Sequence, residues 1–156
     1  MIRFNCDYSE GAHPRVLDKL IETNMEQTEG YGDDPYCQKA AGLIRGLCRR
    51  PDAGVHFLVG GTQTNLIVIS ACLRPHQAAV AADTGHINTH ESGAIEATGH
   101  KILAVPSIDG KLTAGQIQAL YSSHYGDEVR EHTVQPKLVY ISNPTEFGTI
   151  YTKAEL

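Results

Sequence analysis

The sequence predicts an α/β fold of three layers, in which helices cover both faces of a mostly parallel sheet. From residue 55 onward, short apolar runs of strand length alternate with segments of helical pattern. Strands joined by helices imply right-handed crossovers and parallel neighbours. The strand candidates are continuously apolar, as expected when both faces of a sheet are covered. The composition agrees, because 41% of the residues are hydrophobic and 20% are charged.

The chain has 156 residues, which fits one domain or part of a larger protein. Its net charge of −5 and the lack of a Lys/Arg cluster argue against a nucleic-acid-binding surface. No apolar stretch approaches the roughly 20 residues of a membrane span, and no signal-peptide pattern follows Met1. The four cysteines are scattered and never form CxxC, which predicts reduced thiols in a cytoplasmic protein.

Two helices are expected before the alternating part. Pro14 is a favourable first helical residue, and apolar residues follow it at helical spacing until the glycine-rich segment 30–32. A second helix is expected over residues 35–49, with Asp33 or Asp34 as its N-cap.

The alternating part is expected to contain strands at 55–59, 78–82, 101–105 and 137–142. Helices are expected between them at 62–73, 90–98 and 113–123. Thr113 and Gln116 form a capping-box pattern at the start of the last of these helices, and Thr152 repeats the pattern with Glu155. Because the sequence stops in the first turn of that further helix, we expect a truncated chain.

A pair of glycines, Gly60 and Gly61, separates the first expected strand from the helix at 62–73. Such a turn presents unpaired backbone N–H groups and the positive end of a helix dipole, which bind anions and phosphate above all. Thr62 adds a hydroxyl donor. The helix itself is apolar all round, so we expect it to be buried. The spacing matches neither GxxxxGK[ST] nor GxGxxG. The alternative is a tight strand-to-helix turn that binds nothing.

A second polar segment, residues 83–91, follows the strand expected at 78–82. Ligands of open α/β sheets lie at the carboxyl ends of the strands. His86 and His90 are four residues apart, so on a helix they could chelate a metal, although spacing indicates no third ligand. A metal hydrolase that uses His86, His90 and the adjacent Glu91 is therefore one possible function. Satisfied or solvated histidines are one alternative. Stacking of an imidazole on the aromatic ring of an organic ligand is the other.

A third segment, residues 142–149, follows the last expected strand. Asn143 precedes Pro144, and a residue before proline is held in an extended conformation. The Asn143 amide could then point toward the ligand site at the carboxyl ends of the strands. An ordinary Asn-Pro turn is the alternative.

Together these segments resemble the fold-type-I pyridoxal-phosphate enzymes, specifically the threonine aldolase and β-eliminating lyase family. VGGTQTN at 59–65 is similar to the Ser-Gly-Thr-x-x-Asn loop that grips the cofactor phosphate. DTGHINTHE at 83–91 resembles the segment whose histidine stacks on the pyridine ring. GYGDDPY at 30–36 resembles a Tyr-Gly-x-Asp stretch near the dimeric active site. The resemblance covers essentially the whole chain.

The resemblance implies a set of residues for binding pyridoxal 5'-phosphate. Gly61 and Thr62 would bind the phosphate, with the N–H of Gln63 as a further donor. His86 would stack on the ring and shuttle a proton at the substrate hydroxyl, which makes it the candidate catalytic residue. Asn143 would lie near the phenolic oxygen of the ring.

The resemblance also places a substrate-binding segment at Asp7, Tyr8 and Ser9, near the substrate carboxylate. Two positions depart from the family pattern. Gly60 replaces the usual serine, which removes a serine-type contact, and Pro144 makes the loop after Asn143 resemble that of aminotransferases.

The implied fold is the large domain of the aminotransferase-like enzymes, incomplete at the C-terminus. We expect residues 1–33 to form an N-terminal segment and helix, and residues 34–156 to form the first part of the cofactor-binding domain. The family's Schiff-base lysine, the aspartate that pairs with the pyridine nitrogen and the carboxylate-binding arginine are all expected after Leu156. Lys101 and Lys153 are not credible substitutes for that lysine.

The implied activity is that of a lyase acting on amino acids, by aldol cleavage of threonine-like substrates or by β-elimination, with racemisation also open. A homodimer or homotetramer is implied by the resemblance alone. Without the later strands, strand edges and apolar helix faces would be uncovered, so we expect an aggregation-prone or oligomer-dependent chain. The alternative is a non-catalytic chain that binds a phosphate-bearing ligand or a partner chain.

Overall fold

The structure is a computed structural model, and it describes Cys6 and residues 8–156. The chain divides into two compact units, residues 1–57 and residues 58–156. The domain boundary expected between residues 33 and 34 stays a prediction. Among the described residues, no helix combines the length and the apolar character needed to cross a membrane.

The first unit contains the two expected helices. Helix α1 spans Pro14–Thr23 and helix α2 spans Pro35–Cys48, so α1 ends earlier than expected. The Asp34 side chain accepts a hydrogen bond of 2.8 Å from the N–H of Cys37 and caps α2 as predicted. Arg49 closes the same helix in the left-handed conformation.

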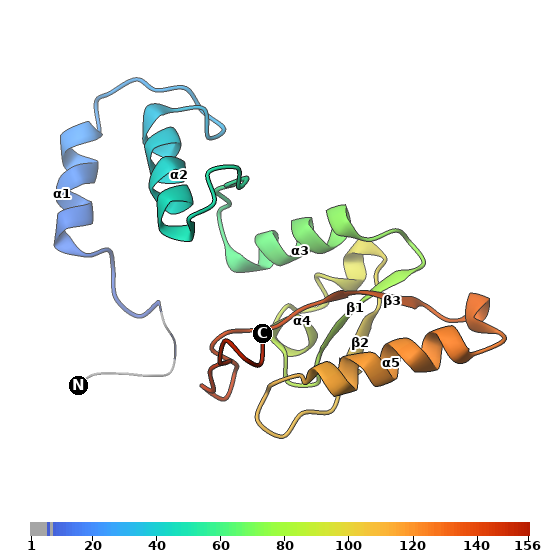
Figure 1. Cartoon of the computed structure of the whole chain (residues 1–156). Helices are drawn as coiled ribbons and strands as arrows, with labels where there is room; N and C mark the ends of the chain where they lie inside the picture. The colour runs from blue at the N-terminus through green and yellow to red at the C-terminus, as the bar shows by residue number, and fades with distance from the viewer. Residues whose placement is uncertain (1–5, 7) are drawn as a thin grey trace. The chain divides into compact units, whose positions relative to one another are not determined.

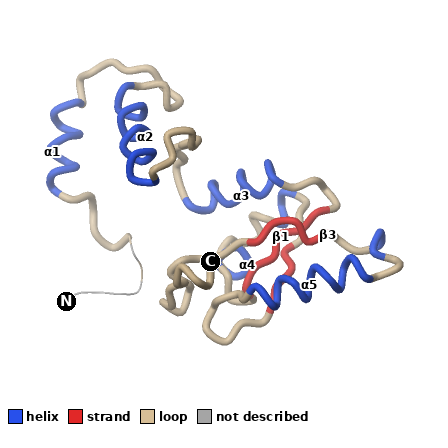
Figure 2. Tube along the Cα trace, in the orientation of Figure 1, coloured by secondary structure: helices blue, strands red, loops and turns tan. Residues whose placement is uncertain are grey.

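The second unit contains a three-stranded parallel sheet in the order β2-β1-β3. The strands are β1 at Gln77–Ala82, β2 at Ile102–Val105 and β3 at Gln135–Val139. The α-helices are α3 at Gly61–Cys72, α4 at His86–Thr89 and α5 at Ala114–Gly126. Short 3-10 turns lie at Glu96–Thr98 and Arg130–His132. Figure 2 shows the three strands side by side with helices around them.

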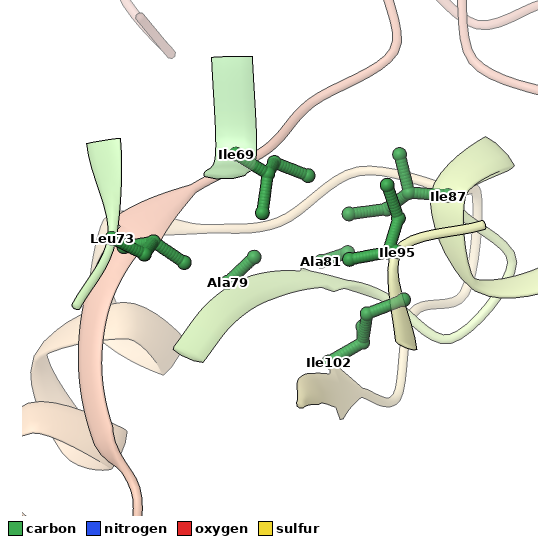
Figure 3. Packing of buried hydrophobic residues seen from close by; sticks show 7 residues of the cluster. All are labelled: Ile69, Leu73, Ala79, Ala81, Ile87, Ile95 and Ile102. Atoms are coloured by element: carbon green, nitrogen blue, oxygen red, sulfur yellow. The ribbon is translucent and has the colours of Figure 1, made fainter. Parts of the chain in front are cut away.

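Side chains on the two faces of β1 enter two different clusters. On one face, Ala79 and Ala81 pack with residues of α3 and α4 and with Ile95 and Ile102. Figure 3 shows these side chains converging on the middle of β1. On the other face, Val80 and Ala82 pack with Leu112 and with Ile117 and Leu120 of α5. Helices therefore lie on both faces of the sheet (Figure 1), which confirms the predicted three-layer α/β class.

Two expected elements are wrong. Residues 55–59 do not form a strand, because the described sheet offers them no neighbouring strand with which to pair. No α-helix forms at 90–98, where an irregular turn follows α4 and leads into the short 3-10 turn at Glu96–Thr98. Ser92 and Gly93 interrupt the expected helix, since both have positive φ, at 52° and 78°.

The expectation that α3 is buried is also wrong. Ile69 is its only buried residue, and the side chains of Ile67 and Val68 are exposed. The described residues of the second unit cover one side of this apolar helix, where Ile69 packs against the sheet.

Candidate cofactor-binding site

The N-terminus of α3 has the geometry of an anion site. Gly60 is the N-cap in extended conformation, and no side chain caps the helix. The first helical hydrogen bond runs from the N–H of Thr64 to the carbonyl of Gly60, at 3.0 Å. The N–H groups of Gly61, Thr62 and Gln63 therefore precede the regular helical bonds and are available to an acceptor. A Cβ atom placed on Gly61 would meet nothing within 4 Å, so the approach to these groups is open.

The site next to this turn is organised by Glu91. Its side chain is fully buried, whereas the side chain of His86 is 45% exposed. Glu91 Oε1 accepts a hydrogen bond of 2.8 Å from Asn65 Nδ2 in the second turn of α3. The same oxygen lies 2.9 Å from His86 Nδ1. One carboxylate thus joins the predicted phosphate-binding helix to the predicted ring-stacking histidine.

The ionisation of Glu91 follows from these contacts. Burial raises the pKa of its carboxyl, but hydrogen bonds from Asn65, Thr62 and His86 outweigh burial, so the pKa lies below its ordinary value of 4.5. The second carboxylate oxygen of Glu91, Oε2, is buried and has no hydrogen-bond partner of ordinary geometry among the described residues. A negative carboxylate therefore lies beneath the exposed histidine.

His86 is held at the carboxyl end of the central strand β1. Asp83, the first residue after that strand, accepts hydrogen bonds through Oδ1 from the N–H and the hydroxyl of Ser107, at 3.0 and 2.8 Å. Gly85 permits the sharp turn into α4, since a Cβ there would lie 3.0 Å from the carbonyl oxygen of Ala82. His86 then opens α4.

His86 and His90 are not arranged to share a metal ion. The two imidazole rings stack with centroids 5.5 Å apart. His90 Nδ1 pairs with the Thr89 hydroxyl at 2.6 Å, and His86 Nδ1 pairs with Glu91. Among Cys6 and residues 8–156, no group of three or more histidine, cysteine, aspartate or glutamate residues is placed to hold a metal ion.

Asn143 lies in the loop after β3, as predicted, and is exposed. Its Oδ1 accepts a hydrogen bond of 3.1 Å from the N–H of Tyr151, and its peptide bond to Pro144 is cis. Tyr151 anchors this loop. Its side chain is buried, and its hydroxyl accepts a hydrogen bond of 2.6 Å from the N–H of Leu112. The amide of Asn143 thus shapes its own loop, and its contact with a cofactor ring stays a prediction.

The predicted substrate-binding segment belongs to the first unit. Asp7 lies outside the described residues. Tyr8 is exposed, and the Ser9 hydroxyl lies 3.0 Å from the sulfur of Cys6. The role of these three residues in binding a substrate carboxylate stays a prediction.

Sequence reasoning missed the supporting residues of the site. The family motif includes Asn65 but implies no role for it, and the sequence suggests Glu91 only as a metal ligand. The signal for Asn65 is its place as a polar residue directly before the apolar run 66–69 of α3. Asp83 and Ser107 carry no local signal, because their contact joins loops that follow different strands.

Comparison with known proteins gives consistent matches over nearly the whole chain. The family described as "Beta-eliminating lyase" matches residues 7–156. A low-specificity L-threonine aldolase of Pseudomonas aeruginosa is 29% identical over 156 residues, and one of a Pseudomonas species is 30% identical over the same length. Each alignment covers 99% of this chain, and the chain spans 44% of the length of each relative.

A solved structure also matches the chain. The threonine aldolase of Leishmania major is 56% identical and superposes with a TM-score of 0.90. The match covers 96% of this chain and 42% of that chain.

Proposed function

Because the chain belongs to the beta-eliminating lyase family, we propose that it supplies the cofactor site of a pyridoxal-phosphate-dependent lyase acting on β-hydroxy amino acids such as threonine. The observation that carries this proposal is the sharing of Glu91: its carboxylate contacts both Asn65 of α3 and His86 at the end of β1. An open, uncapped helix N-terminus and a half-exposed imidazole are thereby held at one place.

The residues present fit the cofactor. The N–H groups of Gly61, Thr62 and Gln63 would hold its phosphate, which gains from the positive end of the α3 dipole. The exposed face of His86 would stack on its ring. When bound, pyridoxal phosphate supplies an electron sink that weakens bonds at the α-carbon of an amino acid.

The role proposed for His86 is proton transfer at the substrate hydroxyl. In aldol cleavage the β-hydroxyl loses its proton as the bond between the α- and β-carbons breaks, and an aldehyde and glycine are formed. His86 would accept that proton, because its Nδ1 is engaged by Glu91 and its other nitrogen remains for the ligand. Asn143 and the segment Asp7, Tyr8 and Ser9 remain proposed contacts to the ring oxygen and the substrate carboxylate.

The choice of aldol cleavage over β-elimination follows the activity for which the aldolase relatives are named. The proposal includes assembly as a homodimer or homotetramer and, from the scattered cysteines, a cytoplasmic location. We assign the Schiff-base lysine to residues outside this chain.

The test is an assay of the protein that carries this chain at its native length, with pyridoxal phosphate added. We expect L-threonine to give equal amounts of acetaldehyde and glycine, and the His86→Asn variant to lose most of this activity while retaining cofactor absorbance. If the protein instead releases pyruvate and ammonia from a substrate with a β-leaving group and does not cleave threonine, the activity is β-elimination and not aldol cleavage. Binding of the cofactor without either reaction would support a non-catalytic binding chain.

A further inference from the structure

We propose that Glu91 is a positioning residue that holds His86 in a single tautomer, with the proton on Nδ1 and the lone pair on Nε2. The tautomer is a property of this chain's own side chains. Its use in catalysis rests on the function proposed above, since only a bound substrate gives Nε2 a proton to accept.

The contact between the two residues specifies where the proton lies. Glu91 Oε1 is 2.9 Å from His86 Nδ1, which is a normal hydrogen-bond length. An ionised carboxylate only accepts hydrogen bonds, so the nitrogen that faces it must be the donor. In the opposite tautomer, the lone pair of Nδ1 would face the negative oxygen, and the contact would be repulsive. A neutral His86 therefore carries its proton on Nδ1.

The Glu91 carboxylate is itself held in place, so its hydrogen bond can fix the orientation of the His86 ring. Asn65 Nδ2 donates to the same Oε1 at 2.8 Å from a different element, helix α3. The Glu91 side chain has no exposed surface, so it cannot turn into solvent without breaking both contacts. Support of an imidazole by a hydrogen-bonded carboxylate is the general way in which a ring nitrogen is oriented.

The neighbouring histidine does not compete for this role. His90 stacks on His86 through its ring and pairs its own Nδ1 with the Thr89 hydroxyl. Its distinct hydrogen-bond partner makes it an internal reference, because both rings lie in one segment but the Nδ1 atom of His86 pairs with Glu91 and that of His90 pairs with Thr89.

The experiment is a long-range ¹H–¹⁵N spectrum of the protein that carries this chain at its native length, labelled on its histidine side chains and recorded without cofactor at a pH where His86 is neutral. The His86 signals are assigned with a His86→Asn variant. We expect the wild-type ring to show a protonated Nδ1 and an unprotonated Nε2. A protonated Nε2, or an even mixture of the two tautomers, would overturn the proposal.

Two substitutions at Glu91 separate positioning from a general structural role. In Glu91→Gln the amide oxygen still accepts from Nδ1, so we expect the tautomer to be largely retained. In Glu91→Leu the acceptor is lost, and we expect His86 to shift toward the Nε2–H form that free histidine favours, with His90 unchanged. Equal spectra in the leucine variant and the wild type would contradict the proposal. Glu96→Leu is the matched control, because Glu96 is an exposed acidic residue of the same segment.

Because no cofactor is present, this outcome is independent of the proposed activity. A wrong tautomer would overturn the role of Glu91 and leave cofactor binding standing. The expected tautomer in a chain that binds no cofactor would do the reverse.

Discussion

Asn65 donates a hydrogen bond of 2.8 Å to the carboxylate of Glu91, which lies 26 residues further along the chain. Asn65 belongs to the helix that begins at the glycine pair, and Glu91 belongs to the segment that follows β1. The contact therefore ties the two loops with the strongest functional signals to each other.

The ionisation of Glu91 predicts the acid side of the stability profile. Its pKa in the folded chain lies below the ordinary value of 4.5, so the unfolded chain binds the proton first as the pH falls. The stabilisation is present above about pH 4.5 and is lost as the pH falls through the folded pKa. We expect the free energy of unfolding of Glu91→Gln to depend less on pH in this window, measured by urea unfolding between pH 3 and pH 7. Glu96→Gln, which removes the same charge from an exposed position, should retain the wild-type slope.

Gly110 is predicted to be intolerant of any side chain. Its φ is +81°, and a Cβ there would lie 2.9 Å from the Cβ of Thr145, a buried residue. The left-handed conformation alone costs about 1–2 kcal/mol for a residue with a Cβ. Gly110→Ala should lose more than this, because Thr145 and the loop around it must also move. The measurement is the free energy of unfolding in urea.

Gly99 provides the matched control for this substitution. Its φ is +84°, and a Cβ there would meet nothing within 4 Å. Gly99→Ala should thus show only the conformational cost of about 1–2 kcal/mol. Equal losses at the two positions would mean that the contact between Gly110 and Thr145 does not constrain the loop.

Helix α3 offers a test of where the core ends. Ile69 is 1% exposed and packs on the sheet, whereas Ile67, two residues earlier, is 38% exposed. Ile69→Ala should cost about 2–5 kcal/mol of unfolding free energy through lost burial and the cavity left behind. Ile67→Ala should cost clearly less, since much of its side chain is already in water. If Ile67→Ala is as costly as Ile69→Ala, the exposed side of α3 is covered in solution by a second copy of the chain.

Local signals in the sequence predicted the N-caps of two helices and the central strand. Asp34 caps α2, and Thr113 with Gln116 forms a complete capping box on α5. Both interactions lie within four residues, so the sequence contains all that they need. The buried run at Gln77–Ala82 was also predictable, because a central strand buried on both faces is continuously apolar.

The failures concern structure that depends on distant residues or on backbone conformation. Residues 55–59 have the composition of a strand, but a strand also needs a neighbour, which the described sheet does not provide. The prediction of a helix at 90–98 was wrong because Ser92 adopts a positive φ, which a serine in a sequence does not indicate. In the site, Gly61 and His86 carried recognisable signals, whereas the pairing of Asn65 with Glu91 is a tertiary contact between separate segments.

The central claim is that the N-terminus of α3 binds the phosphate of pyridoxal phosphate, and Gly61→Asp tests it most directly. A Cβ atom at Gly61 would meet nothing within 4 Å, and a carboxylate at a helix N-terminus favours folding by about 0.3–1 kcal/mol. It should nevertheless repel the cofactor phosphate. Ser70→Asp adds the same charge at an exposed position in the last turns of α3 and serves as the control.

The measurement is the dissociation constant of pyridoxal phosphate for each variant, followed by absorbance, with pyridoxal as the ligand that lacks the phosphate. We predict that Gly61→Asp weakens the binding of pyridoxal phosphate by about tenfold or more, equivalent to roughly 1.4 kcal/mol, while Ser70→Asp binds like the wild type. The affinity for pyridoxal should change little in either variant. Equal affinities of the wild type and Gly61→Asp for pyridoxal phosphate would contradict the claim.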